Sequence, residues 1–197
     1  MYTRQEIQNI LSNGDQFARM DLAQDLVEYP VELAEPILLG LLDDEVDLVR
    51  VNACDSLCIS RSLSVWDRLM QMAKMDVFLV RGYAILSATE ITVQTNEGIT
   101  TMKDFLTQRL RQEKSQWVKV CIYTGLYQLG EVKWIGNLFT LLNHRQYRIR
   151  CSVVNSLADI ADKNNIVAIR QALAGRMQIE TSEAVMSTIR STGILLK

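Results

Sequence analysis

Apolar residues recur along the chain at the three- and four-residue spacing of amphipathic helices, and short segments rich in Asn, Asp, Gly and Thr interrupt them. The pattern predicts six pairs of helices. The first helices of the pairs are expected near residues 3–12, 32–42, 62–73, 99–112, 132–142 and 164–175. The second helices are expected near residues 15–29, 46–60, 77–91, 116–129, 146–161 and 181–195. The segment from Thr92 to Gly98 is expected to be a loop between two pairs.

One basic residue recurs in the second helices and shows that the pairs are repeats. It is Arg19, Arg50, Arg81, Lys119 and Arg150, at steps of 31, 31, 38 and 31 residues. A period in this range indicates stacked helix pairs, because one pair cannot bury its apolar stripe without its neighbours. We therefore predict an all-α, right-handed α-solenoid of about six antiparallel helix pairs, forming a single domain over residues 1–197.

Residues 36–57 carry the clearest copy of the repeat, with a proline early in the first helix, an aspartate in the turn and Val49-Arg50 opening the second helix. This stretch resembles a HEAT repeat, and the 31-residue step is similar to the short bacterial HEAT-like repeats of the phycobilisome-lyase type. The resemblance implies a superhelix in which the second helices line the concave side. Six residues before the other basic positions stand Asn13, Met75, Glu113 and His144 in place of aspartate. A ladder of turn aspartates and arginines is therefore expected to be partial.

The repeated Arg or Lys is itself expected to be structural. It shares a helix side with the apolar positions, where a half-buried guanidinium can bond the carbonyls and the aspartate of its own turn. We expect it to stack on the next repeat.

The composition favours a soluble, cytoplasmic protein with a single domain. The chain is 48% hydrophobic and has only two prolines, so no linker interrupts the predicted core. Its first residues do not form a secretory signal, and its longest apolar run is too short to span a bilayer. Cys54, Cys58, Cys121 and Cys151 lie within helical patterns, as buried thiols of reduced interiors do.

Charge divides the chain in two. Residues 1–98 hold 7 Lys/Arg and 16 Asp/Glu, for a net charge of −9. Residues 99–197 hold 14 Lys/Arg and 7 Asp/Glu, for a net charge of +7. Such an asymmetry concerns partners and association rates and does not decide the fold.

Catalytic, metal-binding and cofactor motifs are not evident, so we expect no catalytic residues, no metal and no cofactor. His144 is the only histidine, and Cys54 and Cys58 lack a second Cys/His pair that would complete a zinc site. The alternative is a HEAT-like enzyme or nucleic-acid-handling protein, such as a chromophore lyase or an alkylpurine DNA glycosylase. The glycosylases place an aspartate close to a tryptophan, and Trp66, Trp117 and Trp134 have none one turn later.

The candidate binding groove lies on the side of the second helices opposite the repeated basic residue. Positions 2, 5, 6 and 9 residues after it share that side. These positions are mostly small, polar or acidic, and the alternative is an ordinary solvated face with Ser or Gly packed at the sixth position. The candidate groove residues are Asp21, Asp25, Glu28, Asp55, Tyr83, Glu90 and Asp159.

The turns within the pairs form a second candidate surface, whose charge changes sign along the chain. The second repeat carries Asp43, Asp44, Glu45 and Asp47 there, whereas later turns are basic with aromatic residues nearby. Basic and aromatic side chains together can bind an acidic peptide or single-stranded nucleic acid. Lys and Arg at helix C-termini also simply complement the helix dipole. The candidate basic rim consists of Arg109, Arg111, Lys114, Trp117, Arg145 and Arg148.

Together these patterns favour a non-catalytic protein-interaction module or adaptor. We expect a protein partner that is basic where it meets the N-terminal half, including the case of an inhibitor that sequesters a toxin or an enzyme. Neither nucleic acid nor a membrane is expected as a partner. Head-to-tail self-association remains open, because the two halves carry opposite charge.

Overall fold

The computed structural model describes residues 2–194, and within this range it contains twelve α-helices and no strand. The first helices are α1 (Arg4–Asn13), α3 (Val31–Leu41), α5 (Leu63–Met75), α7 (Ile99–Gln112), α9 (Ile135–Leu141) and α11 (Ile166–Ile179). The second helices are α2 (Gln16–Asp25), α4 (Asp47–Ser56), α6 (Phe78–Thr95), α8 (Gln116–Gln128), α10 (Tyr147–Asp159) and α12 (Glu183–Ser191). Short 3₁₀ turns extend three of them: η1 (Leu26–Glu28), η2 (Leu57–Ile59) and η3 (Val132–Trp134).

The six predicted pairs are therefore confirmed, with ends that differ by a few residues. The end of the last predicted helix, at residue 195, lies outside the described residues. None of the helices in residues 2–194 is long and apolar enough to cross a membrane.

The chain forms two compact units, unit 1 (Met1–Met102) and unit 2 (Lys103–Lys197). The single domain expected over residues 1–197 stays a prediction. The boundary falls where the charge changes sign, since residues 99–102 carry no charge. Unit 1 is thus the acidic unit and unit 2 the basic one.

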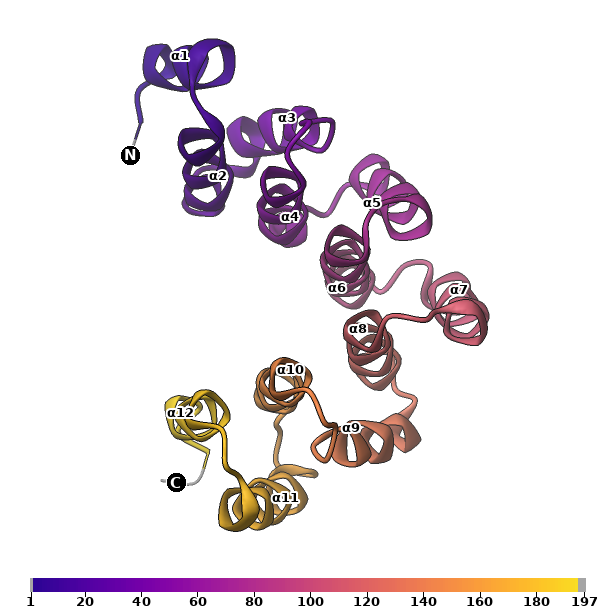
Figure 1. Ribbon diagram of the computed structural model, residues 1–197. Coiled ribbons are helices and arrows are strands. Elements are labelled where there is room, and N and C mark those ends of the chain that lie inside the picture. The colour runs from indigo at the N-terminus through magenta and orange to yellow at the C-terminus, as the bar shows by residue number, and fades with distance from the viewer. Residues whose placement is uncertain (1, 195–197) are drawn as a thin grey trace. The chain divides into compact units, whose positions relative to one another are not determined.

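In unit 1 the second helices pack side by side, α2 against α4 and α4 against α6, while α1, α3 and α5 cover their other side (Figure 1). Leu22, Leu38, Leu57, Leu69 and Ile85 are fully buried between the two rows. These leucines and isoleucines supply the main driving force, because burying each such side chain stabilises the fold by about 1.5–3 kcal/mol.

Unit 2 repeats this arrangement, with α10 packed between α8 and α12. Val153, Val154 and Leu157 of α10 centre a cluster that includes Leu138 of α9, Ile169 of α11 and Ile189 of α12. Because α10 contributes to both of its interfaces, its apolar positions occupy a wide stripe.

The loop predicted from Thr92 to Gly98 is wrong over most of its length. Helix α6 continues to Thr95, and only Asn96–Gly98 separates it from α7. The Thr92 hydroxyl donates to the Ala88 carbonyl at 2.8 Å and accepts from Nε1 of Trp66 on α5 at 2.9 Å. Packing against α5 thus outweighs the weak helix propensity of threonine. Asn96 ends the helix in the left-handed region, at φ 57°.

Candidate interaction surfaces

The repeated arginines of unit 1 join successive turns. Arg19 donates to the Gly14 carbonyl of its own turn at 2.8 Å, and its Nε lies 2.6 Å from Oδ2 of Asp44 in the next turn. Arg50 repeats the arrangement, with the Asp44 carbonyl at 2.8 Å and the carboxylate of Asp76, again one turn further along, at 2.8 Å. Each guanidinium therefore fastens a turn to its successor.

Unit 2 contains the same device in its most buried form. Arg150 donates to the His144 carbonyl at 2.7 Å and to Oε1 of Glu180 at 2.6 Å. The Glu180 side chain is fully buried and also accepts from Arg176 at 2.8 Å. The Oε1 atom of Glu180 also accepts hydrogen bonds from the backbone N–H groups of Thr181 and Ser182, just before α12.

These bonds favour the charged carboxylates. The hydrogen bond from Arg150, with a further one from Arg176, holds the pKa of Glu180 far below its ordinary value despite burial. Burial opposes the charge of Asp44 and Asp76, but the arginine and a backbone N–H on each outweigh it and lower both pKa values. At neutral pH all three are ionised partners of arginine.

The repeated arginines bond carbonyls of their own turn, as predicted. The prediction that their carboxylate partner also comes from their own turn is wrong. The acid comes from the next turn, except that Asp47 of the same helix also bonds Arg50, at 2.7 Å. The six-residue spacing does not identify Asp76, because Asp76 stands five residues before Arg81. It does not identify Glu180 either, because no repeated arginine follows Glu180. The ladder is more complete than the aspartate spacing predicted.

We call the surface of α2, η1, α4 and α6 that stays exposed in unit 1 the second-helix face of unit 1. Asp21, Asp25, Glu28 and Asp55 are exposed on it, and Glu90 is half-buried. None of these five carboxylates forms an ion pair with another described residue. The arginines of the same helices bond the turns instead, so the face carries uncompensated negative charge.

Local titration behaviour reflects this negative charge. Burial first, and then the charges of Asp55 and Glu90, raise the pKa of the Cys58 thiol. Desolvation also raises the pKa of Asp55. Among residues 2–194, the side chain that hydrogen-bonds the Glu90 carboxylate is the neutral Gln94, at 2.9 Å.

Elsewhere the predicted groove positions are covered by neighbouring helices. The small residues at the sixth position, Ser56, Ser87, Gly125 and Ser156, are buried, as the packing alternative requires. Cys121 and Thr124 of α8 are buried as well, and Tyr83 is half-buried. Asp159 is exposed and belongs to unit 2, whereas the other acidic groove positions belong to unit 1.

The basic rim is divided between structural and exposed side chains. Arg109 bonds Glu113 at 2.9 Å, and the buried Glu113 accepts from the backbone N–H of Lys114 and of Ser115. Arg109 therefore holds its own turn. Trp117 is partly buried against the apolar cluster of unit 2. Arg111 and Lys114 are exposed.

The turn between α9 and α10 carries the rest of the rim. Arg145 and Arg148 are exposed, and Tyr147 is 44% exposed. The Arg148 guanidinium carbon lies 5.9 Å from the centroid of the Tyr147 ring, within the range of a cation–π contact. This turn presents an aromatic ring between two cations.

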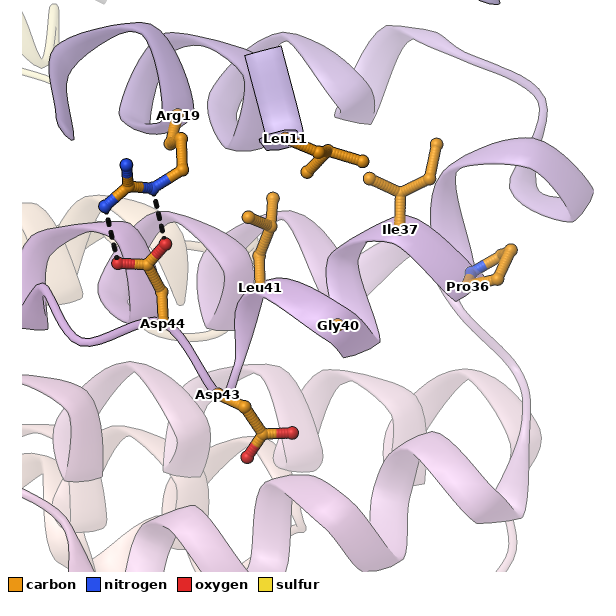
Figure 2. A pocket seen from close by; sticks show the side chains of 8 residues that line it. All are labelled: Leu11, Arg19, Pro36, Ile37, Gly40, Leu41, Asp43 and Asp44. Atoms are coloured by element: carbon orange, nitrogen blue, oxygen red, sulfur yellow. Dashed lines mark hydrogen bonds and ion pairs between the residues drawn. The ribbon is translucent and has the colours of Figure 1, made fainter. Parts of the chain in front are cut away.

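A crevice opens in unit 1 between α1 and α3, with a volume of about 460 Å³ (Figure 2). Leu11, Ile37 and Leu41 form its apolar walls. The Arg19–Asp44 pair lies at its turn end, next to Asp43. We call it the α1–α3 crevice.

Two of the four cysteines have thiols that are hard to ionise. Burial raises the pKa of the Cys54 and Cys121 thiols well above the ordinary range. No group of three or more His, Cys, Asp or Glu in residues 2–194 has the geometry of a metal site. Trp66 lies between α5 and α6, and Trp134 stacks on Tyr123 with ring centroids 5.5 Å apart.

Within each unit, helix pairs packed through their second helices and joined by arginine–carboxylate bonds between turns define an all-α solenoid of the HEAT-like repeat type. Among solved structures, the chain is similar to one in the complex of CpcE and CpcF of phycocyanin lyase from Nostoc sp. PCC7120. The TM-score is 0.53 at 18% identity, and the match covers 99% of this chain and 95% of that one.

A designed armadillo repeat protein also matches, with a TM-score of 0.43 at 18% identity over 97% of this chain and 98% of that one. No protein-family model matches the chain, and no curated protein matches it either. The likeness to the lyase chain bears on the fold, which is that of a helical-repeat solenoid.

Proposed function

We propose that the protein is a non-catalytic interaction module that binds a basic segment of a partner protein on the second-helix face of unit 1. The observation that carries this proposal is the set of five carboxylates on that face, Asp21, Asp25, Glu28, Asp55 and Glu90, none of which forms an ion pair with a residue in the range 2–194. Folding gains nothing from placing like charges together, since they repel one another. A cationic partner would relieve this repulsion.

Stacked repeats suit such a role because they present equivalent positions at regular intervals over an extended surface. Acidic positions recur on α2, α4 and α6, so a partner that lies along the face meets one in every repeat of unit 1. Charge complementarity of this kind chiefly accelerates association, and its range is about 8 Å at physiological salt.

The test uses a synthetic helical peptide with lysines along one side, and its glutamate counterpart, immobilised for surface plasmon resonance. Wild-type protein should bind the lysine peptide only. Reversing Asp25 and Asp55 to Lys should slow association severalfold while the circular dichroism spectrum stays helical. Glu32 and Asp67, exposed on first helices α3 and α5, give the matched control when both are changed to Lys.

The two double variants have the same net charge, so an effect of net charge alone would change both association rates equally. Equal association rates for the two variants would therefore contradict the proposal. The natural partner can then be sought by capture on immobilised wild-type protein and on both variants. A partner held by wild type and control, but lost on the Asp25→Lys, Asp55→Lys protein, is the one that the proposal requires.

A lyase-type enzyme of the same fold is the second candidate, and the likeness to a chain of phycocyanin lyase over nearly the whole length favours it. Incubating the protein with phycocyanin and recording the visible absorption spectrum tests this candidate. A spectral change that depends on the protein would support a lyase and would weigh against a purely binding role.

A further inference from the structure

The turn edge of unit 1 carries apolar side chains that its core does not use. Phe17, Leu48 and Phe78 open α2, α4 and α6, and they are 63%, 46% and 49% exposed. They stand two or three residues before the repeated arginines, so they occupy nearly the same place in three successive repeats. Single exposed apolar residues are normal on a protein surface, but a row at repeat spacing marks an interaction site.

Acidic residues surround this row. Asp43, Glu45 and Asp47, in and after the α3–α4 turn, have side chains that are 71%, 88% and 54% exposed, although each also forms an ion pair within unit 1, with Arg68, Arg19 and Arg50 respectively. The α1–α3 crevice opens beside the same turn, with apolar walls and the Arg19–Asp44 pair at its turn end, while the Asp43 side chain points away from these walls (Figure 2). An occupant that fits this edge has an apolar or aromatic side chain flanked by cations.

The turn edge of unit 2 has that chemistry. Tyr147 is exposed between Arg145 and Arg148, and Arg111 and Lys114 add two cations on the preceding turn of this edge. Tyr and Arg are also the residues that most often supply binding energy at protein interfaces.

We propose that the acidic turn edge of unit 1 binds the basic turn edge of unit 2 in another copy of this chain, with Tyr147 entering the α1–α3 crevice. Each copy carries both edges, so copies can associate head to tail through one kind of contact. The contact uses the turn edges and leaves the second-helix face open. The inference therefore extends beyond the proposed function and can hold or fail independently of it.

Sedimentation velocity tests the inference on the full chain, at protein concentrations up to about 100 µM and at about 0.05, 0.15 and 0.5 M salt. Self-association should be strongest at low salt and weaken as salt screens the facing charges. A monomer under all of these conditions would overturn the proposal.

Charge reversal locates the contact. Changing Asp43 and Glu45 to Lys, or Arg145 and Arg148 to Glu, should weaken self-association about tenfold or more, as expected for the loss of several facing charges. Glu32→Lys with Asp67→Lys again serves as the control and should associate as the wild type does. Association that the control reduces as much as the turn-edge variants would show a general charge effect and contradict the inference.

Mixing the two turn-edge variants gives the decisive result. The Asp43→Lys, Glu45→Lys protein keeps its basic edge, and the Arg145→Glu, Arg148→Glu protein keeps its acidic edge. The mixture should therefore form heterodimers although each variant alone is monomeric. A mixture that stays monomeric would overturn the proposed pairing of edges.

Tyr147→Ala tests the apolar part of the contact. It should weaken association with little change in its salt dependence, whereas Val167→Ala, at a side chain 63% exposed on α11, should not. Equal effects of the two substitutions would remove Tyr147 from the interface.

Discussion

Leu57 and Asp55 stand two positions apart, and the structure places them in different environments. Leu57 is fully buried between helix pairs of unit 1, whereas Asp55 lies exposed on the second-helix face. Leu57→Ala should lower the free energy of unfolding by about 2–4 kcal/mol, since truncation of a buried leucine loses apolar contacts and leaves a cavity.

Asp55→Ala should change that free energy by less than about 0.5 kcal/mol. Urea unfolding of both variants, followed by circular dichroism at 222 nm, measures the two effects. Similar losses for Leu57→Ala and Asp55→Ala would contradict the assignment of helix sides in α4 and, with it, the second-helix face.

Arg109 shows what the sequence could not reveal at this scale. Its basic character and its place near a turn predicted an exposed rim, but Glu113 four residues later binds its guanidinium. Helical spacing allows this pair, whereas burial of Glu113 depends on the fold around it. Charge reversal of the rim is therefore best made at Arg111, Lys114, Arg145 or Arg148.

At the scale of elements, the arginine–carboxylate bonds between turns make stability depend on pH. The folded pKa values of Asp44, Asp76 and Glu180 lie below the ordinary carboxyl values of about 4. A carboxyl with a lowered folded pKa stabilises the fold above its unfolded pKa, and this contribution is lost as the pH falls through the folded value. The free energy of unfolding should therefore decrease as the pH is lowered below about 5.

Asp76→Asn should lower the free energy of unfolding at neutral pH by roughly 1–3 kcal/mol, because Arg50 loses a charged hydrogen-bond partner. The variant should also lose less stability than the wild type on acidification. Asp67→Asn, at an exposed position on α5, is the control and should behave as the wild type. Parallel pH profiles for Asp76→Asn and the wild type would contradict the role given to this carboxylate.

The helix pairs were predictable because apolar spacing and turn residues act locally, and all six pairs were found from them. The continuation of α6 to Thr95 was not predictable in this way, because it depends on a hydrogen bond between Trp66 of α5 and Thr92 of α6. The acidic residues of α2 and α4 are exposed, as their polar character predicts. Cys121 and Thr124 of α8, in contrast, are buried by neighbouring helices. The apolar period of a single helix does not predict this burial, because it depends on how the helices pack.

At the scale of the whole molecule, charge is divided between the two units, −9 in the first half and +7 in the second. Unit 1 repels phosphates, so unit 2 alone can attract them, and several of its cations already bond carboxylates. We expect at most weak binding of duplex DNA, with a steep loss of affinity as salt rises.

Fluorescence anisotropy with a labelled duplex at low and physiological salt measures this binding. A dissociation constant of about 1 µM or tighter at physiological salt would contradict the expectation. Trp134, stacked on Tyr123 with Lys133 5.6 Å from its ring, would then be the first residue to test for contact with bases.

The bonds between turns also give the stack a direction, because the arginine belongs to the earlier repeat and the carboxylate to the later one. Deleting the first pair removes Arg19 and leaves Asp44, whose carboxylate still accepts from the Val46 N–H at 2.9 Å. Deleting the last pair removes Glu180 together with the helices that cover Arg150, and the guanidinium keeps the carbonyls of His144 and Arg145 at 2.7 and 3.2 Å. Shortening the chain from its N-terminal end therefore uncovers a carboxylate, whereas shortening it from its C-terminal end uncovers a guanidinium. Arg150→Met should lower the melting temperature of the full chain, in which Glu180 loses this partner, and should change that of the C-terminally shortened chain little.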